Sequence, residues 1–178
     1  MIAVSGLDEP QELSSAALVR SFNTCFLTSE CTQLVGGAAE PFYRPATAEQ
    51  SAYIFFREDF IASALHEVAH WCLAGPQRRQ LPDYGYWYTE DDRDLVQQQA
   101  FFTVEARPQA LESIFCEMLG VEFRPSIDNP GAEIPGHLLR DFEARVAACR
   151  SQFVRKGLPD RAQRVRRALT ALALECTA

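Results

Sequence analysis

The chain has 178 residues, 47% of them hydrophobic and 23% charged, which is the composition of a folded globular protein with one core and excludes a disordered chain. Its formal net charge of −7 argues against broad binding to nucleic acids or anionic membranes, because both need clustered positive charge. The six cysteines form no Cys-x-x-Cys pair, the first residues do not resemble a signal peptide, and no apolar run reaches the roughly 18 residues of a membrane span. We therefore expect a cytoplasmic protein with reduced thiols.

The first part of the chain predicts one helix followed by two short strands. Residues 10–29 carry apolar side chains at helical spacing, and Gly36 and Gly37 are expected to break the chain after them. The aromatic runs 42–43 and 53–56 are bounded by prolines and polar residues, which favours short strands.

The next predicted helix covers residues 60–74, which contain neither proline nor glycine. Asp59 is a suitable N-cap, Gly75 suits the left-handed position just past a helix, and Pro76 cannot continue it. The aromatic run 84–88 that follows is expected to be extended.

The second half of the chain is predicted to be helical. One helix is expected to begin near Pro108, because proline is tolerated in a first turn, and to end at Gly120. A long loop over 125–136 precedes two closing helices at about 137–155 and 159–176. We therefore expect a mainly helical α+β fold with a short sheet and a metallopeptidase-like metal helix, in a single domain over residues 1–178.

Residues 66–70 read His-Glu-Val-Ala-His, the pattern H-E-x-x-H. On a helix, His66 and His70 lie one above the other on the same face, so that two imidazole nitrogens can reach one metal ion. Glu67 projects to one side of the pair, where it can act on a metal-bound water or co-ligand. The pattern predicts a metal site on this helix.

A catalytic metal site of this kind needs a third protein ligand and an open position. Carboxylates are the natural candidates, because only one other histidine, His137, is present. Glu105 lies between apolar neighbours at the entrance of a helix that should pack inward, and Glu112 lies two turns further along. A carboxylate in such surroundings is explained by a cation, although a first-turn acid can also complement the helix dipole. Residue chemistry gives a modest preference for Glu105 over Glu112.

Two reaction classes fit these residues. Zinc with Glu67 as general base would hydrolyse peptides. Iron(II) held by two histidines and one carboxylate would leave positions for dioxygen and substrate. The ligand types do not separate the two, and the motif by itself favours the hydrolase. A purely structural zinc site is disfavoured, because such sites use four protein ligands and the cysteines lack suitable spacing to the histidines.

The stretch from about residue 55 to 130 resembles the elongation factor P hydroxylase family. The likeness is dense and more specific than the metal motif, and it rests on residues 64–75, 78–79, 83–88 and 104–112, followed by Phe123, Ser126, Asp128 and Asn129. The sequence departs from the family's usual pattern at 90–93, where relatives commonly have Pro-Asp-Gly-Arg, and at Arg107, where a lysine is usual.

The resemblance implies an oxidoreductase that hydroxylates the β-lysyl-modified lysine of elongation factor P. It implies that His66, His70 and Glu105 hold a divalent metal ion, with iron(II) as the working metal and dioxygen as co-substrate. Glu67 then supports the ligating side chains or handles protons beside the metal, instead of acting as a peptidase base. The zinc-dependent metallopeptidase stays the alternative.

Residues next to the metal helix are candidates for substrate binding. They are Asp83, Tyr84, Tyr86, Arg78 and Arg79. The aromatic residues can equally belong to the core, and the two arginines can equally lie in a solvated loop. A substrate side chain with several amines also suits acidic groups at the pocket mouth, for which the candidates are Asp83, Asp91, Asp92 and Asp94.

Overall fold

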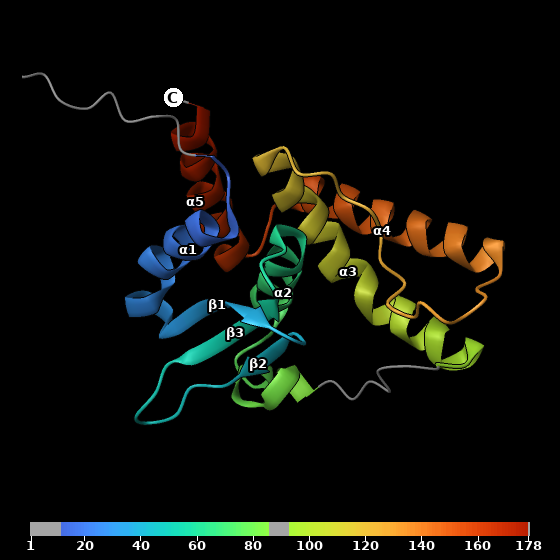
Figure 1. Ribbon diagram of the computed structural model, residues 1–178. Helices are drawn as coiled ribbons and strands as arrows, with labels where there is room; N and C mark the ends of the chain where they lie inside the picture. Colours follow the sequence, from blue (N-terminus) through green and yellow to red (C-terminus); the bar gives the residue numbers. More distant parts are fainter. Residues whose placement is uncertain (1–11, 86–92, 178) are drawn as a thin grey trace, which may run out of the picture.

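The computed structural model describes residues 12–85 and 93–177 (Figure 1). Its elements in chain order are α1 (Ser15–Glu30), β1 (Thr32–Ala38), β2 (Phe42–Arg44), β3 (Ala52–Arg57), α2 (Ile61–Leu73), the 3-10 helices η1 (Arg78–Gln80) and η2 (Pro82–Gly85), α3 (Leu95–Leu119), α4 (Gly136–Lys156) and α5 (Asp160–Thr177). The expected α+β fold, mainly helical with a short sheet, is confirmed. Within the described residues, no helix is both long and apolar enough to cross a membrane.

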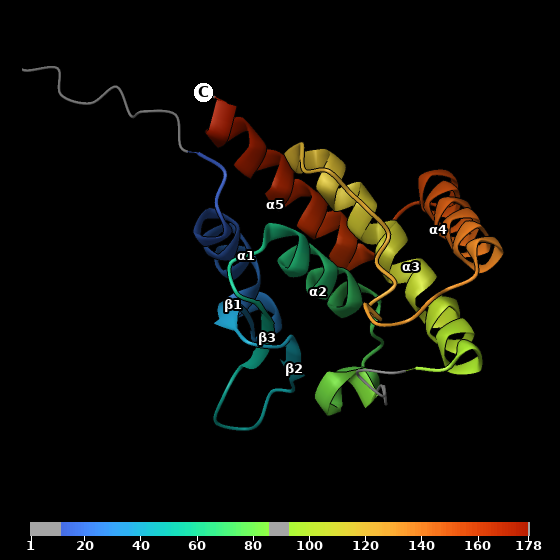
Figure 2. The ribbon, with the colours of Figure 1, turned by 45° about the vertical axis from the view of Figure 1, so that its right-hand side comes forward.

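The predicted metal helix, α2, lies at the centre of the molecule (Figure 2). It packs on β3 on one side and on α3 and α5 on the other. Its apolar face is almost fully buried, and the Trp71 ring meets the Phe22 and Phe26 rings of α1 edge to face at 5.3 and 5.1 Å. Such aromatic packing fixes the helix rigidly in the core.

The sheet has the order β1-β3-β2, with β1 parallel and β2 antiparallel to β3. The two predicted strands are confirmed, whereas β1 was missed because Gly36 and Gly37 were expected to break the chain. Gly36 lies so close to the ring of Phe56 that an added Cβ would come within 2.7 Å of it. Gly37 has φ of 81° at a register shift, so the two glycines form an irregular strand end instead of a break.

Both predicted caps of α2 are wrong. The N-cap position belongs to Phe60, and the Asp59 side chain instead accepts a hydrogen bond from Ser15 on α1 at 3.4 Å. The C-cap is Ala74 in extended conformation, so the helix does not use Gly75 in the left-handed region. At this end of the helix, Arg161 of α5 donates a hydrogen bond to the carbonyl oxygen of Ala74. This bond satisfies a carbonyl group that has no partner within the helix.

The largest error concerns α3, which begins at Leu95 and not near Pro108. Its true start is a capping box, in which Asp94 accepts from the Gln97 amide at 2.8 Å and the Gln97 side chain accepts from the Asp94 amide at 2.9 Å. Pro108 lies inside the helix, where it removes one backbone donor. Burial of this helix on both sides of the proline outweighs that local cost. The predicted end at Gly120, with φ of 65°, is confirmed.

The run 84–88 was expected to be extended, but its described part is not. Tyr84 and Gly85 belong to a tight turn, with φ of 57° and 71°, and Tyr86, Trp87 and Tyr88 lie outside the described residues. The closing helices α4 and α5 agree with their predicted ranges to within two residues.

Candidate metal centre

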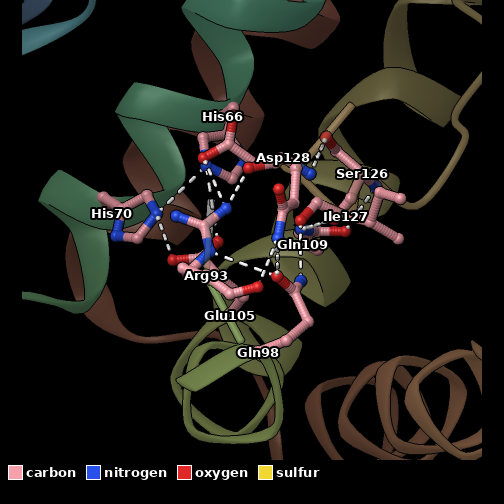
Figure 3. Close-up of polar contacts among 10 residues, drawn as sticks. His66, His70, Arg93, Gln98, Glu105, Gln109, Ser126, Ile127 and Asp128 are labelled. Carbon is pink, nitrogen blue, oxygen red and sulfur yellow. Dashed lines mark hydrogen bonds and ion pairs between the residues drawn. The ribbon is translucent and has the colours of Figure 1, made fainter. Parts of the chain in front are cut away.

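His66 and His70 of α2 face Glu105 of α3 across the contact between the two helices (Figure 3). The two Nε2 atoms are 3.1 Å apart. Glu105 Oε2 lies 3.5 Å from Nε2 of His66, and Glu105 Oε1 lies 3.3 Å from Nε2 of His70. The three side chains can therefore offer one ligand atom each to a single metal ion, with all these atoms within 4.8 Å of one another.

The burial of Glu105 fits a cation better than it fits a helix dipole. Its position in the middle of α3, far from the first turn, removes the dipole explanation. The residue is only 2% exposed, and an ionised carboxylate at that depth needs positive charge beside it. Two neutral imidazoles and one carboxylate form a donor set that suits iron(II) or zinc.

Glu112 occupies a different place from Glu105, although both come from the same face of α3. Its Oε2 lies 2.8 Å from Nδ1 of His66, on the side of the ring away from the cluster. Because a carboxylate can only accept, Nδ1 carries the proton and the lone pair of Nε2 is left for a metal. This geometry favours Glu105 as the third ligand and Glu112 as the residue that orients His66.

The cluster is strongly biased toward holding positive charge. Burial lowers the pKa of His66, but the hydrogen bond that His66 donates to Glu112 and the charges of Glu105, Glu112 and Glu67 outweigh it and raise this pKa to about 10. In the metal-free protein a proton therefore takes the place of a cation. Burial also raises the pKa of Glu67 above its ordinary value, against the opposing charges of His66 and His70. Glu67 thus holds a proton more readily than a solvated glutamate.

Arg93 lies beside the cluster, a placement that the sequence reasoning missed (Figure 3). Residues 90–92 lie outside the described part of the chain, and the Arg93 side chain is only 3% exposed. It donates from Nε to Gln98 Oε1 at 3.2 Å, pairs with Asp128, and lies over the Phe101 ring at 4.2 Å. Of the predicted mouth acids, Asp94 is instead the N-cap of α3.

Glutamine side chains of α3 fix the loop that carries Asp128. Gln98 donates to the carbonyl of Ile127 at 2.8 Å, and Gln109 donates to the carbonyl of Ser126 at 2.9 Å while accepting from its amide at 3.0 Å. Together with Glu105 and Glu112, these glutamines form one polar stripe along α3, with the spacing of a single helix face. The sequence contained this stripe as a signal for the site. It was not recognised because the predicted helix began near Pro108 and so left out Gln98 and Glu105.

Two of the predicted substrate residues lie next to the metal helix and make structural contacts. Asp83 accepts a hydrogen bond from the Tyr43 amide at 2.7 Å. The Tyr84 ring is stacked on Tyr43 at 4.2 Å and lies parallel to the His70 ring at 6.4 Å. Both residues have positive φ, at 45° and 57°, a costly backbone that tends to persist at functional sites.

The two predicted substrate arginines contact the turn and strand beside the metal helix. Arg78 donates from Nε to the carbonyl of Tyr84 at 2.8 Å, and the Arg79 carbonyl accepts from the Tyr43 hydroxyl at 3.0 Å. Arg78 therefore supports the turn that holds Tyr84, and the Arg79 backbone holds the Tyr43 ring that is stacked on Tyr84. Tyr86, Asp91 and Asp92 lie outside the described residues.

Fold and donor set together define a class: a mainly helical protein with a candidate two-histidine, one-carboxylate metal centre on an H-E-x-x-H helix. Comparison with known proteins gives the family. Residues 21–174 match the family model of elongation factor P hydroxylase, and the chain belongs to this family. It is 42% identical over 155 residues to the elongation factor P lysine hydroxylase of Haemophilus influenzae, a match that covers 86% of each chain. Hydroxylases are oxidoreductases, and this chain is an enzyme of that class.

Proposed function

We propose that this protein hydroxylates a lysine of elongation factor P, namely the lysine that has received a β-lysyl group. The substrate follows from the family and from the name of the Haemophilus relative. The observation that carries the chemistry is the cluster of His66, His70 and Glu105, because insertion of oxygen into a C–H bond needs a redox-active centre. The whole chain acts as one hydroxylase domain, and the reaction belongs in the cytoplasm, where translation takes place.

The donor set supports iron(II) as the working metal. Two imidazoles and one carboxylate on one face of the ion leave positions open, which is the arrangement of non-haem iron oxygenases. When bound, iron(II) would supply the site at which dioxygen, the co-substrate, is activated, while a separate two-electron reductant balances the insertion of one oxygen atom and the reduction of the other to water. Zinc can occupy the same donors in purified protein, since imidazole and carboxylate bind both metals.

The other residues of the site orient a ligand, hold a proton or contact the substrate. Glu112 holds the His66 ring by the Nδ1 hydrogen bond of 2.8 Å. Glu67, with its raised pKa, keeps a proton beside the centre and can pass it to or from the reacting groups. Asp83, Tyr84, Tyr86, Arg78 and Arg79 are assigned to the substrate side of the centre.

Intact-mass spectrometry of β-lysylated elongation factor P tests this proposal. The substrate is co-expressed with wild-type protein, with His66→Ala, or with His137→Ala as a matched control, because His137 is the third histidine and is exposed on α4. We expect a gain of one oxygen atom with wild type and His137→Ala, and none with His66→Ala. No gain with wild type on fully lysylated substrate would contradict the proposal, and zinc-dependent peptide cleavage that requires His66 would establish the metallopeptidase instead.

A further inference from the structure

The loop that follows α3 is held beside the metal centre by buried polar side chains. Gln98 and Asn129 are 0% and 1% exposed, and Asn129 Nδ2 donates to Gln98 Oε1 at 3.0 Å and to the Arg93 carbonyl at 3.1 Å. Arg93 donates to the carbonyl of Asp128. Buried polar groups that are fully hydrogen bonded make a rigid, well-defined arrangement. The main chain around Asp128 is therefore fixed with respect to α3, and so with respect to Glu105.

Asp128 is an exposed residue whose backbone is held by this buried network. Its backbone has φ of 45°, and its side chain is 69% exposed, whereas the Arg93 side chain that it contacts at 3.3 Å is 3% exposed. Figure 3 shows Asp128 beside His66 and Arg93. Partial desolvation raises the pKa of Asp128 above its ordinary value, although the charges of Arg93 and His66 and the hydrogen bond from Arg93 oppose this rise. Solvent approaching the centre from this side therefore meets a carboxylate and not the guanidinium.

Two of the acids expected at the pocket mouth lie within the described residues, and both make other contacts. Asp83 accepts from the Tyr43 amide, and Asp94 caps α3. The substrate nevertheless needs a negative partner, because a lysine-type side chain carries an ammonium group. Such a group is repelled both by a bound dication and by Arg93, and an exposed carboxylate beside them offsets this repulsion.

We propose that Asp128 is the specificity residue that receives an ammonium group of the lysine-derived substrate side chain at the mouth of the metal centre. This inference rests on the proposed function for the identity of the substrate. It assigns a direct substrate contact to Asp128 and a positioning role to the buried residues that hold it, above all Arg93 and Gln98. A hydrogen bond between an ammonium group and a carboxylate is of the strong, charge-assisted kind.

Binding measured without turnover tests this assignment. The iron(II)-loaded protein is titrated with β-lysylated elongation factor P in the absence of dioxygen, by calorimetry at low and high ionic strength. Asp128→Asn removes the charge, and asparagine tolerates the left-handed backbone, as does glycine in the second variant Asp128→Gly. Glu143→Gln is the matched control, because it removes one negative charge from an exposed site on α4. Iron content and thermal unfolding are recorded for each variant.

We expect both Asp128 variants to bind the substrate about 10- to 100-fold more weakly than wild type, the range for losing a hydrogen bond to a charged group. Their binding should also respond less to ionic strength, a change that a merely structural role would not produce. Glu143→Gln should bind like wild type. Equal binding by wild type and Asp128→Asn overturns the assignment, as does wild-type protein that does not bind at all. Dioxygen is added afterwards, so that intact binding without a gain of oxygen refutes the hydroxylase function alone.

Discussion

Glu112 offers the sharpest test of how this centre is built. The pKa of His66 is about 10, and the hydrogen bond that His66 donates to Glu112 is the largest contribution that raises it. At pH 8 the protonated form of His66 therefore exceeds the neutral form by about a hundredfold, and a metal must displace that proton. Substituting Glu112→Ala removes the hydrogen bond and the charge together, while Glu112→Gln removes the charge and keeps an acceptor for Nδ1.

Glu112→Ala has two opposing effects on metal affinity, and these can be measured separately. Loss of the group that orients a ligating histidine typically costs 10- to 100-fold in metal affinity, or about 1.4 to 2.7 kcal/mol. The pKa of His66 also falls, so that the proton competes less with the metal at neutral pH. The affinity at the alkaline plateau should therefore decrease, and the number of protons released on binding at pH 8 should drop from near one in wild type to a clearly smaller value.

Zinc titration by calorimetry, with a competing chelator and in buffers of different ionisation enthalpy, measures both quantities. The control is Glu117→Ala, which removes the same charge from the same helix at a side chain that is 65% exposed and paired with Arg150. Glu112→Gln should fall between wild type and Glu112→Ala. If Glu112→Ala keeps the wild-type plateau affinity and proton release, the orienting role of Glu112 is refuted.

Three further predictions concern His66, a buried cysteine and a strand glycine. Because the pKa of His66 is raised from 6.5 to about 10, the stability it gives the metal-free protein is full below pH 6.5 and lost as pH rises through 10, which thermal unfolding across pH measures. Burial raises the pKa of Cys116 to about 12, so mass mapping after alkylation at pH 8 should show slower modification there than at exposed Cys25. Gly36→Ala should lower the free energy of unfolding by about 1–3 kcal/mol in denaturant titrations, because its Cβ would meet an aromatic ring at 2.7 Å, whereas Gly131→Ala has open space and should be nearly neutral.

The metal helix could be predicted because its information is local. The spacing of His66 and His70 places both rings on one face of α2 whatever the rest of the chain does, and the structure confirms the helix. Helix caps, in contrast, depend on neighbours far along the chain. Asp59 binds Ser15 on α1, and the end of α2 is met by Arg161 of α5. No local rule could supply either partner.

The error at Pro108 hid the part of the site that α3 supplies. A proline predicts a helix start from local sterics alone, but here the packing of a long buried helix outweighs the lost hydrogen bond. Once α3 is taken back to Leu95, the inward face shows Gln98, Glu105 and Glu112 in one line, and polar residues on a buried face need partners. The metal cluster and the loop with Asp128 provide them. The local rule thus fails on the helix that builds the candidate site, as expected where function and not local preference selects the residues.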